Sequence, residues 1–469
     1  MPTTRRDFLK TTGQGIVAIP MAASIFSWNN NTNLKKSISP PDNAEKQSGL
    51  TLNVRDFGAT GDGTTKDTLS IQQVIDRCWV LGGGEVIVPA GNYFIGAIAL
   101  RSNTLIRLDK DATLMGTPDF SDYPIMQVRW EGKWIEGHTA LIYGSDVENT
   151  GIIGPGKITG NHALGGRPNP DNPLRHPALI ETIGCKNLRF EDFTTDYYLM
   201  WSLHPTYCEN IVIKNLTIRS TGGNGDGIDI DSCKHVLIDN CDISTGDDCI
   251  AIKSGRGMEG YRLLKTTEDV EIVNCSLADS IFACIGIGSE TSGGIRNIRI
   301  KNCKFTAART YAIYIKSRPG RGAFIEDISA ENLEVSGMKG GFLRFNTLAS
   351  GLQDQDPIPG KEGIPTLKNF SFTNIKVDNV PVLIDGRSVH PDKPLEGFAL
   401  YNVTGTCSKG ISLANIEKAD IQHINVSGFT GALIGINNVT GRGLKDAVSI
   451  NPPKVPEDIP QPDQPYQLK

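Results

Sequence analysis

Short stretches in which apolar and polar residues alternate recur along the middle of the chain. The clearest copies are CKNLRFEDF from Cys185, CENIVIKNLTI from Cys208 and CKHVLIDNCDI from Cys233, and weaker copies begin at Glu268, Ile295, Ile325 and Leu367. Such alternation predicts short strands with one buried face, each ending at Asn or Gly. The second Asn of successive units recurs after 25, 34, 28, 30 and 42 residues, at Asn215, Asn240, Asn274, Asn302, Asn332 and Asn374.

Repeats of this length predict a solenoid whose coils bury their inner faces only by stacking on one another. No helical periodicity separates the strands, which disfavours alternating strands and helices. We therefore expect an all-β, single-domain, right-handed parallel β-helix over Leu50–Ile450, followed by an irregular Pro-rich tail, 451–469. The one clearly amphipathic helix, Asp67–Trp79, is expected to cap the end of the solenoid.

Composition narrows the function classes. The 469 residues carry 47 Lys+Arg against 52 Asp+Glu, a net charge of −5, and no basic cluster follows the first ten residues. This balance disfavours a nucleic-acid partner. Long apolar runs are missing, so the sequence does not resemble a multi-span membrane protein. The 51 glycines, without a fixed period, are typical of a chain that turns often.

The first thirty residues resemble a twin-arginine export signal. The pair Arg5–Arg6 precedes a modest apolar stretch, which Gly13 and Pro20 interrupt too early for a spanning helix. Residues 31–49 are polar and are expected to form a linker. The prediction is therefore a periplasmic or secreted protein with no stable membrane insertion once the signal is removed.

Ten cysteines in an exported protein could indicate disulfides. Their spacing favours another interpretation, because Cys185, Cys208 and Cys233 occupy the same phase of successive repeats. Equivalent positions on stacked coils predict ladders of buried free thiols. No two pairs have the spacing of a zinc site, so metal binding is less favoured still.

The densest chemistry lies between Asn224 and Gly255. Asp226 stands in one coil and Asp247–Asp248 follow 21 residues later, so the three carboxylates are expected to share one surface. Taken alone, Asp226 would be interpreted as a turn residue and Asp247–Asp248 as a solvated pair. The spacing of the three residues, one coil apart, favours a functional site instead. Clustered carboxylates raise one another's pKa, which supplies the protonated acid and ionised base that hydrolysis of a glycosidic bond requires.

The sequence resembles glycoside hydrolase family 28, the polygalacturonases and their relatives, over most of Leu50 to about Gly410. The resemblance rests on NVRDFGATGDGTTKDT, VIVPAGNY, GIIGPGKITG, RHPALI, MWSLHPTYCENIVIKNLTI and the two Asp elements. The stretch DYPIMQVRWEGKW from Asp122 is similar to exo-acting bacterial members.

The resemblance implies a right-handed β-helix and an inverting mechanism. Asp247 would be the general acid, and Asp226 and Asp248 would activate the attacking water. Inversion leads us to expect carboxyl groups about 6.5–9.5 Å apart.

Two positions depart from the family pattern. Ala283 stands where the family has His, and Tyr314 stands where it has the Arg that pairs with Lys316 in binding the substrate carboxylate. We therefore expect a related acidic glycan, of plant type or algal, rather than standard homogalacturonan. The residues expected to bind it are Asn224, Lys253, Tyr314, Lys316, Arg318, Arg321, His204 and Trp130, with His204 also a candidate brace for a strand end. No metal or other cofactor and no partner chain are expected.

Two other functions remain open. A polysaccharide lyase on the same fold would use Asp residues to hold Ca²⁺ and a Lys as base. A non-catalytic glycan-binding relic would explain Ala283 and Tyr314, although all three Asp residues are retained. The loops Arg256–Thr267 and Gly351–Thr366 would favour exo action if they close the cleft into a pocket.

Overall fold

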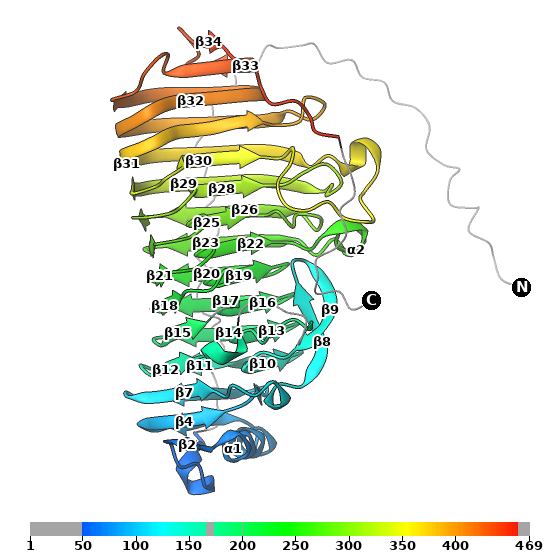
Figure 1. Cartoon of the computed structure of the whole chain (residues 1–469), viewed down its shortest axis with the longest axis vertical. Coiled ribbons are helices and arrows are strands. Elements are labelled where there is room, and N and C mark those ends of the chain that lie inside the picture. Colours follow the sequence, from blue (N-terminus) through cyan, green and yellow to red (C-terminus); the bar gives the residue numbers. More distant parts are fainter. Residues whose placement is uncertain (1–48, 166–172, 199, 458–469) are drawn as a thin grey trace, which may run out of the picture. The chain divides into compact units, whose positions relative to one another are not determined.

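The computed structural model describes residues 49–165, 173–198 and 200–457. Parallel pairing joins each strand to its counterpart in the next coil and gives one sheet of 32 strands, from Thr51 to Ser449 (Figure 1). The prediction of a right-handed parallel β-helix is confirmed. The predicted export signal, all of the linker but Gly49, and the end of the Pro-rich tail lie outside the described residues.

The coils contribute strands to three parallel stacks. The first contains β1 (Thr51–Asn53), β3 (Gly84–Val88), β6 (Thr104–Leu108), β11 (Glu148–Ile153), β14 (Lys186–Glu191), β17 (Glu209–Lys214), β20 (Lys234–Asp239), β23 (Thr267–Val273) and β26 (Ile295–Lys301). The second contains β2 (Asp62–Lys66), β4 (Gly91–Ile95), β7 (Ala112–Gly116), β12 (Lys157–Thr159), β15 (Thr194–Tyr198), β18 (Thr217–Ser220), β21 (Asp242–Ser244), β24 (Ser276–Ala278) and β27 (Lys304–Phe305).

The third stack carries the functional residues. It contains β5 (Ile98–Ala99), β10 (Ile142–Ser145), β13 (Ile180–Ile183), β16 (Leu203–Thr206), β19 (Ile228–Asp231), β22 (Ile250–Lys253), β25 (Ile285–Ile287), β28 (Tyr311–Lys316) and β30 (Gly341–Asn346). Longer strands continue the coils toward the C-terminus: β29 (Phe324–Ser336), β31 (Thr366–Ser388), β32 (Leu395–Ser427) and β33 (Ile434–Arg442), followed by the short β34 (Val448–Ser449).

Asparagine ladders hold the corners between stacks. Each of the six repeat Asn residues has φ between 53° and 57°, a left-handed conformation that Asn tolerates better than most residues. Their side chains also bond from coil to coil: the Asn240 amide donates to Asn215 at 2.8 Å, and Asn374 donates to Asn332 at 3.0 Å. The ladder is interrupted at one position: across the 34-residue step, the Asn274 amide donates to Asp239 at 2.9 Å instead of to Asn240.

The capping helix is confirmed with a shift of one residue. The helix α1 (Thr68–Val80) buries Ile71, Val74, Ile75 and Cys78 against the core beside the first coils (Figure 1). The other helical segments are α2 (Gly257–Leu263) and the 3₁₀ turns Val54–Phe57, Phe120–Asp122, His162–Leu164 and Gly360–Gly363. Within the described ranges, none of the helices has the length and apolarity that a bilayer crossing requires.

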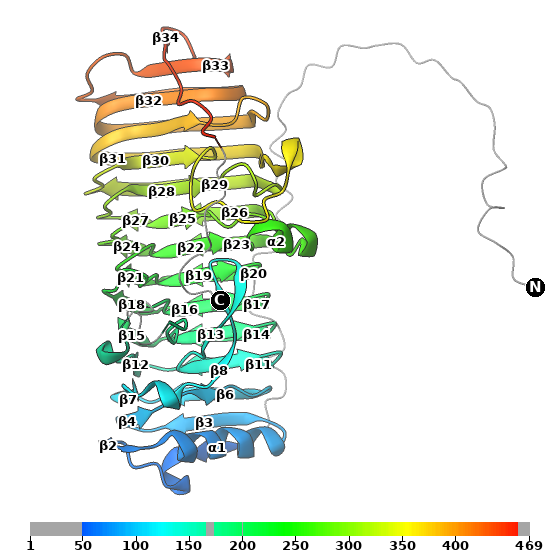
Figure 2. The same cartoon turned by 45° about the vertical axis from the view of Figure 1, so that its right-hand side comes forward.

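One feature outside the coils was not predicted. Strands β8 (Ile125–Trp130) and β9 (Lys133–His138) form an antiparallel hairpin, which runs along the third stack toward α2 (Figures 1 and 2). We call residues 125–138 the hairpin. The loop after β22 also contains the short helix α2, which the sequence pattern did not indicate.

The cysteine ladders are confirmed, since all ten cysteines are free and buried. The backbone N–H groups of Cys185 and Cys208 each donate to the sulfur one coil on, at 3.3 Å. We expect a thiol-specific reagent to modify less than one cysteine per native chain and ten after denaturation, because reaction needs an exposed thiolate. Several rapidly reacting thiols in the native protein would contradict this packing.

Candidate active site

The three predicted carboxylates meet at the start of the third stack. Asp226 lies just before β19, and Asp247 and Asp248 lie just before β22. Ile228 pairs with Ile250, so Asp226 and Asp248 occupy equivalent positions on consecutive coils. The backbone N–H of Gly227 fixes this alignment by donating to the Asp248 carbonyl at 3.0 Å. The register of a parallel sheet therefore brings together residues that are 22 positions apart.

Each carboxylate has a different electrostatic surrounding. Asp248 accepts from Lys316 Nζ at 2.8 Å and from the backbone N–H of Ala283 at 3.0 Å. Asp226 has Lys253 Nζ at 3.9 Å. Asp247 is the most exposed of the three, and its Oδ1 accepts from the N–H of Asp248 at 2.9 Å, with no ion pair to a described Lys or Arg. Asp247 therefore has the least compensation for a negative charge.

The pKa shifts follow these surroundings. Burial and the charges of Asp226 and Asp248 raise the pKa of Asp247 to about 8. Burial and the charge of Asp229 raise the pKa of Asp226 well above its usual value. At neutral pH the cluster therefore retains a proton, which Asp247 can hold where it faces the cleft.

The three carboxylates approach one another closely. One oxygen from each of Asp226, Asp247 and Asp248 lies within 4.8 Å of the others. The reason is structural: Asp247 and Asp248 are adjacent, and neighbouring strands stack about 4.8 Å apart. A single water that donates two hydrogen bonds of about 2.8 Å spans nearly the same distance. The arrangement can thus hold one water between two carboxylates.

These oxygens are also close enough to bind a divalent cation. Two ammonium groups already lie beside the cluster, Lys316 at Asp248 and Lys253 near Asp226. Their charges reduce the attraction for a metal ion and favour the interpretation as a proton-transfer site.

Two buried acidic residues were missed as site residues. Asp229 is fully buried on β19 and accepts from Lys253 Nζ at 2.5 Å. Burial raises its pKa to about 6 despite the opposing charge of Lys253. Glu290 is 6% exposed. Burial by itself would raise the pKa of Glu290, but the charges of Lys253 and Arg321 outweigh burial and lower this pKa. The alternation IDID was a signal for Asp229, since it places this side chain on the outer face of the coil.

Three predicted substrate contacts are not supported by the structure. His204 is 1% exposed, and its Nδ1 lies 3.0 Å from a Glu181 oxygen, so it braces adjacent coils. Trp130 is 3% exposed because it stacks on Trp201 at a centroid distance of 4.9 Å. Arg321 is fully buried in an ion pair with Asp354. All three residues instead make contacts within the protein scaffold.

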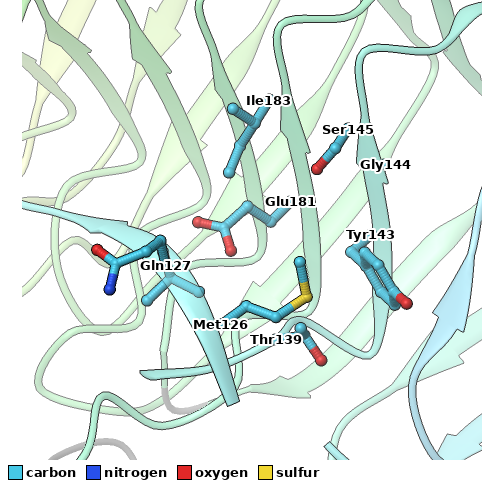
Figure 3. A pocket seen from close by; sticks show the side chains of 9 residues that line it. Met126, Gln127, Thr139, Tyr143, Gly144, Ser145, Glu181 and Ile183 are labelled. Atoms are coloured by element: carbon cyan, nitrogen blue, oxygen red, sulfur yellow. The ribbon is translucent and has the colours of Figure 1, made fainter. Parts of the chain in front are cut away.

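A small cavity under the hairpin belongs to the same supporting region. Figure 3 shows it between β8 and the strands β10 and β13, with the Glu181 carboxylate among its lining side chains. Although burial opposes ionisation, Arg175 at 3.0 Å and His204 lower the pKa of Glu181. This carboxylate is thus neutralised within the scaffold.

The remaining predicted residues lie near the cleft. Asn224 comes two residues before Asp226, and its side-chain oxygen makes no hydrogen bond among the described residues. Arg318 is 8% exposed and donates to the Gly351 carbonyl at 2.7 Å. Tyr314 is 7% exposed and pairs in register with Gly286. A Cβ at Gly286 would lie 2.2 Å from Asp248 Oδ2, so this position must be glycine for Asp248 to reach Lys316.

Buried ion pairs join the hairpin to β19, to α2 and to the segment that follows β30. Arg129 contacts Asp231 at 3.3 Å and Glu259 of α2 at 3.0 Å. Arg256 contacts Glu131 of the hairpin at 3.1 Å and Asp354 at 3.0 Å. These ion pairs connect the hairpin with β19, with α2 and with the segment 351–363. We call the hairpin, α2 and the segment 351–363 together the cover.

The cover reaches the carboxylates through an aromatic contact. Trp130 of the hairpin stacks on Trp201, and Lys253 Nζ lies 4.4 Å from the centre of the Trp201 ring. Lys253 in turn contacts Asp229 and Asp226. The cover is thus connected to the carboxylates through Trp130, Trp201 and Lys253.

Comparison with known proteins agrees with the fold and with the family resemblance. The family model of glycosyl hydrolases family 28 matches residues 78–381. A probable polygalacturonase of Vitis vinifera is 29% identical over 363 residues, covering 74% of this chain and 73% of the relative. An exo-poly-alpha-D-galacturonosidase of Dickeya chrysanthemi is 25% identical over 451 residues, covering 84% and 69%.

Solved structures show the same fold. The exopolygalacturonase of Thermotoga maritima has a TM-score of 0.65 and 25% identity, covering 84% of this chain and 92% of that one. The family 28 exopolygalacturonase of Yersinia enterocolitica has a TM-score of 0.71 and 20% identity, covering 84% and 78%.

Proposed function

The chain belongs to glycosyl hydrolases family 28, and from this premise we propose an exported, exo-acting, inverting glycosidase for uronate-containing glycans of the pectin type. The observation that carries the proposal is the contrast between two adjacent carboxyl groups. Asp248 contacts the Lys316 ammonium, whereas the pKa of Asp247 is raised to about 8 by burial and by its acidic neighbours. One is suited to act as base and the other as acid.

The proposed reaction is a single displacement. Asp247 donates its proton to the glycosidic oxygen as the bond from that oxygen to the anomeric carbon breaks. A water held between Asp226 and Asp248 attacks the anomeric carbon from the opposite face, and its proton passes to Asp248. The sugar leaves with inverted configuration, and proton exchange with solvent restores both carboxyl groups.

Exo action is proposed from the cover. A polymer that passes through the site would need space on both sides of the carboxylates, and we propose that the hairpin, which is inserted between β7 and β10, closes the N-terminal side. Arg256, which is 3% exposed, links the hairpin to the 351–363 segment through ion pairs. A bounded end accepts a chain terminus, and the rest of the glycan extends over β25, β28 and β30. The names of the Dickeya and Thermotoga relatives agree with this proposal.

The location is a further part of the proposal. Residues 1–30 would direct export through the twin-arginine route, and 31–49 would link the signal to a single catalytic domain, 50–450. We propose a monomer in the periplasm or outside the cell, where plant-type polysaccharide is accessible.

A digest of polygalacturonate, low-ester pectin and alginate tests the hydrolase. We expect new reducing ends from the galacturonate polymers, released as small products, with no ultraviolet absorbance from unsaturated sugars. Full activity in excess chelator is also expected. Unsaturated products, or activity that depends on Ca²⁺, would instead support the lyase. Binding without any cleavage would support the non-catalytic relic.

Substituting Lys316→Met should move the alkaline limb of the pH profile. The charge of Lys316 lowers the pKa of Asp247, so its removal should raise that pKa above about 8. The acid then keeps its proton to higher pH, and kcat/KM should fall at a higher pH than in the wild type. Lys304→Met, on the surface of β27, is the matched control. An unchanged alkaline limb in Lys316→Met would contradict the assignment of Asp247.

A further inference from the structure

A nearly buried carboxylate near the catalytic lysines has no hydrogen-bond donor of its own. Glu290 follows β25 and is 6% exposed, yet no hydrogen bond or ion pair joins its carboxylate to a residue in the described ranges. Although burial opposes this, the charges of Lys253 and Arg321 lower its pKa, so the group is ionised at neutral pH. An ionised carboxylate that is withdrawn from water without donors is costly. This indicates that a bound molecule supplies the donors.

Glu290 lies between the catalytic lysines and the cover. Strand β25 pairs with β22 and with β28, the strands that end in Lys253 and Lys316. Both lysines contact the catalytic carboxylates. Ser289, the residue before Glu290, packs against the cover, because a Cβ on Gly351 would lie 2.2 Å from Ser289 Oγ. A sugar that reacts at the carboxylates can therefore reach Glu290 with its far side.

The hairpin brings a second carboxyl group into the same surroundings. Oε2 of Glu131 contacts Arg256 at 3.1 Å, whereas the other oxygen makes no hydrogen bond to the part of the chain that the structure describes. The Glu131 side chain is 23% exposed. Burial and the charge of Glu290 raise the pKa of Glu131, although Arg256 opposes this. The two carboxyl groups therefore face a common space.

The backbone at Glu131 departs from the usual chemistry of its turn. Glu131 and Gly132 form the two-residue turn between β8 and β9, with φ of 41° and 78°. Such a turn favours Asn, Asp or Gly at its first position, and a glutamate is disfavoured there. The turn is nevertheless fixed, since Arg256 N–H donates to the Gly132 carbonyl at 3.1 Å. A residue that opposes the local preference in this way is typical of a binding site.

The surrounding charges favour a hydroxyl over a cation as the missing donor. Lys253, Arg321, Arg256 and Lys316 all lie close enough to lower the pKa of Glu290. A further cation would be repelled by these groups. A sugar hydroxyl donates without adding charge, and a hydrogen bond to an ionised carboxylate is stronger than one between neutral groups.

We infer that Glu290 identifies the chain end by accepting a hydrogen bond from the C4 hydroxyl of the terminal sugar, with Glu131 closing the space beyond that oxygen. In a polygalacturonate chain only the terminal sugar has a free C4 hydroxyl, because every internal C4 oxygen is bonded to the next sugar. The inference rests on the proposed function, since it places the anomeric carbon of this sugar at Asp226 and Asp248. It adds a specificity-determining residue, Glu290, and a requirement for an unsubstituted chain end.

Three disaccharides of α-linked galacturonate test the inference without any variant. The terminal sugar has a C4 hydroxyl, lacks it, or carries it as a methyl ether. We expect kcat/KM of the wild type to fall at least about tenfold for both analogues, because Glu290 then has no donor. Equal rates on all three would overturn this inference and leave the proposed function standing. No hydrolysis of any of them would overturn the proposed function as well.

The variant Glu290→Gln connects the discrimination to this side chain. Its kcat/KM should fall by about 10–10²-fold on the unmodified disaccharide, the usual effect of losing a hydrogen bond to a charged group. On the 4-deoxy analogue the change should be less than about threefold, because that bond is already missing there. Glu326→Gln, on the outer face of β29, is the matched control and should behave as the wild type. Equal losses on both substrates in Glu290→Gln would indicate a structural role and contradict the inference.

Discussion

Substituting Asp247→Asn is expected to lower kcat by about 10²–10⁴-fold, the usual contribution of a general acid. The amide cannot donate the proton that the departing oxygen needs. The loss should be largest for substrates with a sugar leaving group and much smaller for an aryl glycoside whose phenolate leaves without protonation. Steady-state kinetics on both substrate types measure this difference, which a purely structural defect would not produce.

The pH profile supplies a second signature of the same residue. The pKa of Asp247 is raised to about 8, so the acid is protonated below this pH and loses its proton above it. Activity of the wild type should therefore fall as the pH rises through about 8, and the residual activity of Asp247→Asn should lack that limb. Asp242→Asn, exposed on β21, is the control and should retain the wild-type profile. Equal losses on sugar and aryl substrates would contradict the role of Asp247.

Shortening the hairpin is expected to change the products from single small units to a mixture of longer oligosaccharides. The variant replaces Gln127–Glu136, which pair with each other at the ends of this segment, by a two-residue Asn-Gly turn. It removes Glu131 and Arg129 and thereby breaks the ion pairs that join the hairpin to Arg256 and Asp231, while Arg256 keeps its contact with Asp354. The N-terminal side of the cleft would then be open to a continuing chain.

Viscosity loss per bond cleaved measures this change, together with chromatography of the first products. Ile125→Ser, at the exposed base of the hairpin, is the matched control and should release the same products as the wild type. Thermal unfolding checks that the shortened protein is folded, since the hairpin also contributes Val128 and Trp130 to the core. A folded variant that still releases only single small units would contradict the role of the cover.

Much of the fold could be predicted because its determinants are local. Each repeat Asn marks a corner at which the backbone becomes left-handed, and the apolar alternation between corners fixes the inward face. The meeting of Asp226 with Asp248 followed from the same logic, because a solenoid places equivalent positions of consecutive coils side by side.

The cover could not be predicted, because it depends on contacts between distant residues. Arg129 and Asp231 are 102 positions apart, and Arg256 and Glu131 are 125 apart. Periodicity carries no information on such pairs. The same limit applies to Arg321, whose residue type suggested substrate contact while its burial depends on Asp354. For His204, the predicted role as a brace agrees with its burial against Glu181. The close approach of the three Asp oxygens, within 4.8 Å of one another, likewise depends on how neighbouring strands stack.

The most direct test of the central claim follows the anomeric configuration of the first product by ¹H NMR. The substrate is an α-linked oligogalacturonate, and spectra are recorded faster than mutarotation. The account predicts that a β-configured uronic acid monosaccharide appears first and that the α form grows only by mutarotation. Initial release of the α form, or of an unsaturated product, would contradict it.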